Sequence, residues 1–200
     1  VIMTAPHIGN TGMNNEDMES ANIWVSGFAV RNPSPRVSNW RSERSLEDSL
    51  IDAGVVGIQG VDTRAITRHL RDRGSMRVGI FSGAELTREE MVVRVRQIPA
   101  MSGSFLVDDV TTNEKYVVPV PMGVAKRFTV AALDLGIKSA TPRLMSLRGI
   151  EVHVFPSTAT KDEILAIEPD GFFLSNGPGD PATMDSVVEL VREFLLDSLP

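Results

Sequence analysis

The amino-acid sequence predicts an α/β protein, in which a mixed α/β domain precedes the first βαβαβα half of a doubly wound parallel sheet. Strand-like and helix-like segments alternate from residue 55 onward, which is the order that layered α/β folds produce. Residues 128–136 are almost continuously apolar, as expected of a parallel strand that is covered on both faces. Thr, Ser and Asp caps and terminal glycines separate the helix-like segments from the strands.

The first domain, residues 1–118, begins irregularly and becomes regular. Residues 1–10 read like the inside of a strand, so we expect the natural chain to begin upstream of Val1. Pro33 and Pro35 exclude a helix from the turn-rich residues 32–43. We expect strands at residues 23–30, 55–58 and 76–81. We expect helices at residues 45–54, 62–74 and 87–99, with Ser45, Asp62 and Thr87 as their caps and Glu90 completing a capping box.

A linker is expected at residues 119–127, because helical periodicity fails between about residues 110 and 126 and two prolines break the segment. The second domain, residues 128–200, has the clearest pattern. Its strands are expected at residues 128–136, 150–155 and 171–174. Its helices are expected at residues 141–149, 160–169 and 184–199. The signals are a Thr141 cap with Pro142 in the first turn, a Thr160–Glu163 capping box, and an apolar face of Val187, Val188, Val191, Phe194 and Leu195.

Composition excludes several classes of function. The chain has 200 residues and a formal charge of −6 with both signs interspersed, so we expect no nucleic-acid partner. No apolar run approaches the roughly 18–20 residues that span a bilayer, so no membrane partner is expected. The sequence contains no Cys, which excludes a disulfide framework, a thiolate metal site and a Cys nucleophile within these residues.

The sequence "SNGPGDP", residues 175–181, follows a predicted strand and precedes a predicted helix. Ligands of open parallel sheets bind beyond the carboxyl ends of the strands. Gly177 and Gly179 allow close approach to the backbone and a positive φ, while Pro178 and Pro181 stiffen the loop. Such a loop can present backbone N–H groups to a phosphate or to the oxyanion of an acyl-transfer intermediate.

The residues after the glycines favour the oxyanion. A phosphate-binding P-loop places Lys and then Ser or Thr after its glycines, whereas Asp180 and Pro181 follow here. Asp180 would repel phosphate, and Pro181 has no N–H to donate. The alternative that needs no ligand is a tight strand-to-helix turn, and glycine and proline content alone does not separate it from a binding loop.

The quoted loop resembles that of class I, triad-type glutamine amidotransferases. Further segments resemble, in family order, the small-chain family of carbamoyl phosphate synthetases. They are "TAPHIGNTG", "SNWR", "GVDTRAITRHLRDRGSM", "VAALDLGIK" and "FFLSNGPGDPA". The resemblance covers nearly the whole chain. It implies a flavodoxin-like amidotransferase domain, of which residues 128–200 would be the N-terminal part, behind the small chain's own N-terminal domain.

The resemblance also implies a function. Small chains of this family hydrolyse glutamine and pass ammonia to a large chain, which uses bicarbonate and ATP to make carbamoyl phosphate for arginine and pyrimidine biosynthesis. The implied partners are therefore the large chain and glutamine, in a cytoplasmic heterodimer. No cofactor or metal is expected on this chain, because ATP, Mg²⁺ and bicarbonate would bind the large chain. Two other classes stay open, a non-catalytic binding or scaffold protein of the same fold and a nucleotide-binding α/β domain.

The family's site residues carry over only in part. Gly177 matches the glycine whose N–H helps to form the oxyanion hole, and Gly179 matches a glycine that contacts glutamine. No catalytic side chain carries over, because the family's Cys nucleophile is absent and His7, His69 and His153 lie outside its catalytic histidine segment. The 200 residues alone are therefore expected to be an inactive fragment that ends before the nucleophile strand.

Two further groups allow two interpretations each. Arg64, Arg68, Arg71 and Arg73 lie on one predicted helix and form either a solvated face or a contact with the large chain. Asp134 and Lys138 flank a glycine that follows a predicted strand, and they form either a structural turn or a second small-molecule contact.

Overall fold

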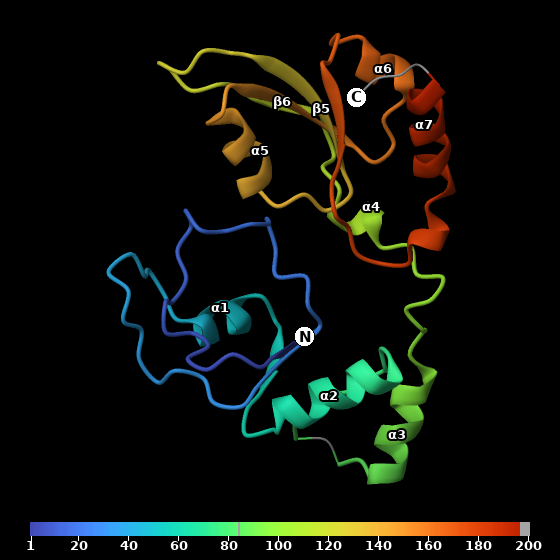
Figure 1. The fold of residues 1–200 in the computed structure, drawn as a ribbon. Coiled ribbons are helices and arrows are strands. Elements are labelled where there is room, and N and C mark those ends of the chain that lie inside the picture. Colours follow the sequence, from blue (N-terminus) through green and yellow to red (C-terminus); the bar gives the residue numbers. More distant parts are fainter. Residues whose placement is uncertain (84, 197–200) are drawn as a thin grey trace. The chain divides into compact units, whose positions relative to one another are not determined.

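The computed structural model describes residues 1–83 and 85–196, and the chain forms two compact units, Val1–Ala100 and Met101–Pro200. The N-terminal unit contains a parallel sheet in the order β1 (Ile2–Met3), β2 (Gly27–Val30) and β3 (Val56–Ile58). Its helices are α1 (Leu46–Asp52), α2 (Thr63–Arg73) and α3 (Arg88–Gln97) (Figure 1).

Helix starts in this unit are capped as the sequence predicts. The Ser45 hydroxyl accepts a hydrogen bond from the Asp48 N–H at 3.0 Å, and Asp62 accepts one from the Ala65 N–H at 3.0 Å. Thr87 caps α3, and Glu90 completes the capping box by accepting from the Thr87 N–H at 2.7 Å. These predictions succeed because each cap depends only on residues within one turn.

Two strand predictions in this unit need correction. The expected strand at residues 76–81 is wrong, because this segment joins neither sheet among the described residues. A β-rich sequence forms a strand only where a neighbour completes its ladder, and Met76 and Val78 instead remain more than half exposed, at 53% and 56%. The strand expected at residues 23–30 is confirmed only over Gly27–Val30.

The C-terminal unit contains a four-stranded sheet in the order β4-β6-β5-β7. Its strands are β4 (Tyr116–Val118), β5 (Phe128–Asp134), β6 (Ile150–Pro156) and β7 (Gly171–Leu174). The last three are parallel, and β5 lies between β6 and β7, so their order is 2-1-3 along the chain. This is the strand order with which flavodoxin-like sheets begin, and the predicted fold class is confirmed. Strand β4 adds an antiparallel edge beside β6.

Helices cover both faces of this sheet (Figure 1). On one face α6 (Lys161–Leu165) and α7 (Asp185–Leu196) pack over Leu133 and Phe155, with Ile164 and Phe194 in the core. On the other face α5 (Ala140–Ser146) lies over Ala132, Val152 and Val154, with Met145 packed against them. Short helices α4 (Val107–Val110) and η1 (Pro181–Thr183) complete the unit.

Two details of these helices differ from the prediction. The buried face of α7 is Val187, Leu190 and Phe194, whereas Val188 and Leu195 are exposed at 43% and 71%. Helix α5 begins at Ala140 after Ser139, without a side-chain cap, so Thr141 is not the cap. The Thr160–Glu163 capping box is confirmed. The expected last turn of α7 beyond Leu196 lies outside the described residues.

The segment before β5 belongs to the C-terminal unit. Strand β4 pairs with β6, with Val117 opposite His153, and Val107 of α4 is buried in the core of that unit. The structural units therefore divide at Ala100, earlier than the expected linker at residues 119–127. The family-domain division at residue 118 stays a prediction.

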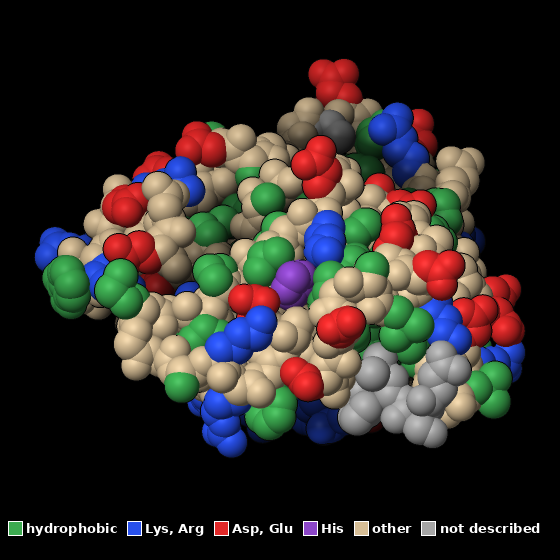
Figure 2. Space-filling view, turned by 90° about the horizontal axis from the view of Figure 1, so that it is seen from above, with side chains coloured by type: hydrophobic (Ala, Val, Ile, Leu, Met, Phe, Trp, Pro, Cys, Tyr) green, Lys and Arg blue, Asp and Glu red, His purple; other side chains and the backbone are tan. Residues whose placement is uncertain are grey.

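Two observations concern the length of the helices and the charge of the surface. None of the described helices is both long and apolar enough to cross a membrane. Acidic and basic side chains are interspersed on the face that Figure 2 shows.

Candidate functional site

The candidate site lies at the carboxyl edge of the C-terminal sheet, where neighbouring strands β5 and β7 end. Leu133 of β5 pairs with Leu174 of β7, so the loops that follow them leave the sheet side by side. Strand β6 lies on the other side of β5. The order in which successive strands are added to the sheet therefore changes direction between β5 and β7. Ligands of open α/β sheets bind at such a switch point.

Ser175 joins the two loops. Its side chain is buried, its hydroxyl accepts a hydrogen bond from the Leu135 N–H at 2.9 Å, and it donates to the Asn176 carbonyl at 2.9 Å. The hydroxyl therefore fixes the start of the β7 loop against the start of the β5 loop. No local sequence pattern indicates this role, because the two residues lie 40 positions apart.

Gly177 sits where no side chain fits. A Cβ at this position would lie 2.2 Å from the Leu135 carbonyl oxygen, far inside contact distance. Only Gly179 of the two loop glycines has the positive φ that the sequence suggests, at 92°, and a Cβ there would lie 2.6 Å from the Ser104 carbonyl oxygen. Close approach of backbones thus requires glycine at both positions, and a left-handed conformation requires it at Gly179.

Two N–H groups of this loop are available for a ligand. Within residues 1–83 and 85–196, neither the Gly177 N–H nor the Gly179 N–H has a hydrogen-bond partner. Pro178 between them has no N–H, and Gly177 is exposed. The loop therefore offers two neutral hydrogen-bond donors, and the Ser175 hydroxyl fixes the start of the loop. The roles of Gly177 and Gly179 in the oxyanion hole and in glutamine binding stay predictions.

Asp180 anchors the far end of the loop. One carboxylate oxygen accepts from the Gly103 N–H at 2.8 Å, and the other accepts from the Ala182 N–H at 3.0 Å and caps η1. The Asp180 N–H in turn donates to the Ser104 carbonyl at 2.9 Å. These bonds, first that from Gly103 and then that from Ala182, hold the pKa of Asp180 below its usual value. Asp180 is therefore an ionised clasp between the loop and residues 102–104.

The clasp predicts a dependence of stability on pH. Because the pKa of Asp180 is lower in the folded than in the unfolded protein, its contribution exists at neutral pH and is lost as pH falls below about 4 toward the folded pKa. Denaturant unfolding should therefore separate wild type from Asp180→Asn at pH 7 and bring them together in strong acid. Exposed Asp109→Asn is the control, and an undiminished difference at low pH would contradict the clasp.

Asp134 belongs to a turn. Its Oδ1 accepts from the N–H groups of Gly136 and Ile137 at 2.8 and 2.7 Å, and its Oδ2 accepts from the Thr112 N–H at 2.8 Å. The side chain is 5% exposed, so its acceptor sites are turned toward backbone and not toward solvent. The structure therefore favours the structural turn over a second small-molecule contact, and it leaves Lys138 exposed.

The other candidate residues do not join this site. His153 lies on β6 with its Nε2 3.1 Å from Glu151, which also pairs with Lys126 at 2.7 Å. His7 and His69 lie in the N-terminal unit and are exposed. No cluster of potential metal ligands occurs among the described residues. The arginines of α2 are exposed, namely Arg64, Arg68, Arg71 and Arg73.

Comparison with known proteins gives two family matches. Residues 1–80 match the carbamoyl-phosphate synthase small chain, CPSase domain, and residues 131–200 match glutamine amidotransferase class-I. Small chains of carbamoyl phosphate synthase from Streptomyces avermitilis and Streptomyces coelicolor are 60% and 61% identical over all of this chain. The small chain of Mycobacterium tuberculosis is 56% identical. The chain spans about half the length of these relatives, 52–54%.

Proposed function

Because this chain belongs to the family of carbamoyl phosphate synthase small chains, we propose that it forms part of a glutamine-hydrolysing subunit. The reaction converts glutamine and water to glutamate and ammonia. A cysteine thiolate attacks the amide carbon, the carbonyl electron pair moves onto oxygen, ammonia leaves with one added proton, and water then cleaves the thioester. The 200 residues contain no Cys, so the thiolate must come from outside them, and these residues alone should not release ammonia from glutamine.

In this proposal the Gly177 N–H donates a hydrogen bond to the oxygen that becomes negative during attack. The observation that supports it is an N–H that has no partner among the described residues, on a loop whose start is fixed by the hydrogen bond from the Leu135 N–H to the Ser175 hydroxyl. A donor that is fixed before the reaction stabilises the transition state without reorganisation. Gly179, on the same loop, is proposed to contact the glutamine substrate.

A phosphate ligand is the less suitable alternative for this loop. A phosphate cradle uses successive N–H groups and a Lys, whereas Pro178 and Pro181 interrupt the donors here. The ionised Asp180 lies directly after Gly179 and would repel a phosphate dianion. An amide oxygen that gains only one charge in the transition state suits two neutral donors better.

We extend the proposal to the partners of the full-length protein. It would form a heterodimer with a large chain, which would hold ATP, Mg²⁺ and bicarbonate and use the ammonia to make carbamoyl phosphate. The assembly would be cytoplasmic and would serve arginine and pyrimidine biosynthesis. Family membership supports these statements.

Ser175→Ala in the full-length protein tests the site. The substitution leaves the buried Leu135 N–H without its acceptor and frees the start of the loop, at a cost of about 1–3 kcal/mol in stability. We expect kcat for glutamine hydrolysis to fall about tenfold or more, because an oxyanion donor acts only when it is correctly placed.

Two controls make this result specific. Exposed Ser186→Ala on α7 should leave glutamine hydrolysis unchanged. Carbamoyl phosphate synthesis from added ammonia should also be unchanged in Ser175→Ala, because it bypasses the proposed site. A Ser175→Ala protein that folds and hydrolyses glutamine at the wild-type rate would contradict the proposed geometry.

A further inference from the structure

Asp180, at the end of the candidate loop, binds a segment that lies 77 positions earlier in the chain. Its carboxylate accepts hydrogen bonds from the Gly103 N–H at 2.8 Å and from the Ser102 hydroxyl at 3.4 Å. Its own N–H donates to the Ser104 carbonyl at 2.9 Å. Backbone and side chain of Asp180 therefore both bind residues 102–104, and together these bonds fix the end of the loop in position and in orientation.

Gly179 packs against the same segment. A Cβ at this position would lie 2.6 Å from the Ser104 carbonyl oxygen and 3.2 Å from the Leu106 nitrogen. The φ of Gly179, 92°, is one of many values that a glycine adopts with ease, so the contacts around it must select this value. Residues 104–106 therefore form a backbone wall beside Gly179, and Asp180 is the side chain that binds the loop to the segment that carries this wall.

The start of the loop has a separate anchor. The Ser175 hydroxyl accepts from the Leu135 N–H at 2.9 Å, two positions before Gly177. Pro178, whose ring fixes its φ, separates the two glycines of the loop. A change at one anchor should therefore displace mainly the glycine beside it, and loss of the Asp180 carboxylate should displace the second glycine more than the first.

We infer that Asp180 is a positioning residue for glutamine binding, which acts by holding Gly179 in place; this inference rests on the proposed function. Gly179 is the proposed substrate contact, and Gly177 is the proposed donor to the oxyanion. A contact that is equal in the bound substrate and in the transition state affects KM, whereas a contact that strengthens in the transition state affects kcat. Loss of the Asp180 anchor should therefore appear in KM, and loss of the Ser175 anchor in kcat.

Steady-state hydrolysis of glutamine by the full-length protein tests this inference. Asp180→Ser keeps one side-chain oxygen, which can cap η1 by accepting from the Ala182 N–H, but it leaves no second oxygen for the Gly103 N–H. We expect KM for glutamine to rise about tenfold or more, while kcat changes less than about threefold. Gly179→Ala should raise KM as well, and the two effects on kcat/KM should not add in the double variant, because both displace the same residue.

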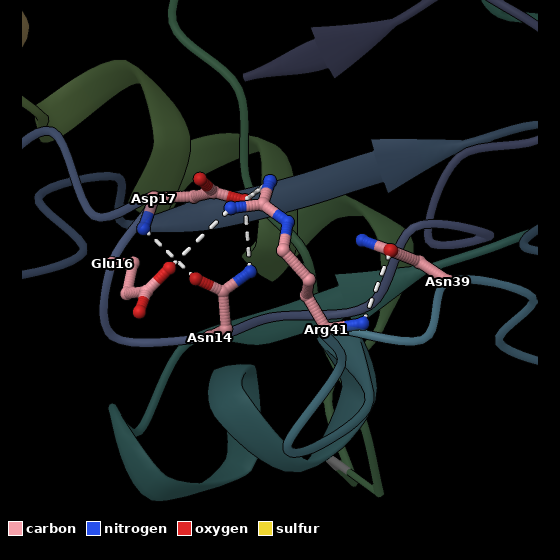
Figure 3. A network of polar contacts seen from close by, with 5 residues as sticks. All are labelled: Asn14, Glu16, Asp17, Asn39 and Arg41. Atoms are coloured by element: carbon pink, nitrogen blue, oxygen red, sulfur yellow. Dashed lines mark hydrogen bonds and ion pairs between the residues drawn. The ribbon is translucent and has the colours of Figure 1, made fainter.

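Two carboxylates that also join separate segments provide matched controls. Asp170, at the opposite edge of the sheet, accepts from the Thr129 N–H at 2.7 Å and donates its own N–H to the Thr129 carbonyl at 2.8 Å, which repeats the pattern found at the loop. Asp17 in the N-terminal unit joins Asn14 to Arg41 through bonds of 2.8 and 2.6 Å (Figure 3). Asp170→Ser and Asp17→Ser should leave both KM and kcat for glutamine unchanged.

Gly103→Ala is a second test, which leaves Asp180 in place. Gly103 has a φ of 79°, and an added Cβ would have no described atom within 4 Å beyond its chain neighbours, so Ala strains the donor's backbone without a clash. Gly60 in the N-terminal unit has the same φ and the same free space, which makes Gly60→Ala the matched control. We expect Gly103→Ala to raise KM for glutamine and Gly60→Ala to leave it unchanged.

Other outcomes separate this inference from the proposed function. If wild type hydrolyses glutamine and Asp180→Ser has an unchanged KM, or loses kcat alone, the inference is wrong and the proposed function stands. If Asp170→Ser raises KM to the same extent, the effect reflects general loss of stability, which also overturns the inference. If Asp180→Ser does not fold, the KM of Gly103→Ala against that of Gly60→Ala decides. If wild type does not hydrolyse glutamine, the proposed function itself fails.

Discussion

Gly177→Ala in the full-length protein is expected to lower kcat for glutamine hydrolysis at least about a hundredfold, the effect of losing one oxyanion-hole donor. The new Cβ would lie 2.2 Å from the Leu135 carbonyl oxygen, which is backbone and cannot rotate away. The loop after β7 must therefore shift, and it carries the Gly177 N–H with it. Steady-state measurement of ammonia release from glutamine checks this result.

A matched glycine provides the control for this substitution. Gly57 has ordinary backbone angles, and a Cβ there would approach nothing closer than the Phe28 carbonyl at 3.8 Å, so Gly57→Ala should hydrolyse glutamine normally. Carbamoyl phosphate synthesis from added ammonia should be unchanged in both variants. A folded Gly177→Ala protein with wild-type kcat would show that this loop does not hold the oxyanion.

Phe194→Ala is expected to destabilise the protein by about 3–5 kcal/mol, the usual cost of removing a buried Phe. Phe194 is 3% exposed, and its ring centroid lies 4.5 Å from that of Phe172 on β7. The substitution removes both the apolar contact of α7 with the sheet and this aromatic pair. Urea denaturation of the full-length protein, followed at the unfolding transition of the C-terminal unit, measures this change in the free energy of unfolding.

The neighbouring residue tests which face of α7 is buried. Leu195 is 71% exposed, so Leu195→Ala should change the free energy of unfolding by less than about 0.5 kcal/mol. Equal effects of the two substitutions would contradict the observed packing.

The sequence predicts those features that depend on neighbouring residues. The capping boxes at Thr87 and Thr160 are confirmed because cap donors and acceptors lie within one turn. The strands β5, β6 and β7 are confirmed because continuous apolar runs are typical of buried parallel strands. The glycines of the candidate loop stand out for the same local reason, since few other residues fit such a turn.

Features that depend on distant residues could not be predicted in this way. The strand expected at residues 76–81 lacks a ladder partner, and the buried side of α7 is chosen by the sheet opposite, which leaves Val188 exposed. The candidate site shows the same limit. Gly103 binds Asp180 across 77 positions and Ser175 binds Leu135 across 40, and no local pattern announces either contact.

The most direct measurement replaces the Gly177 N–H itself. Incorporation of glycolic acid at position 177 of the full-length protein changes this amide to an ester, which removes one donor and adds no atom that would touch Leu135. We predict that kcat for glutamine hydrolysis falls about a hundredfold or more, while carbamoyl phosphate synthesis from added ammonia is unchanged. Glutamine hydrolysis at the wild-type rate in the folded ester protein would contradict the assignment of this N–H to the oxyanion.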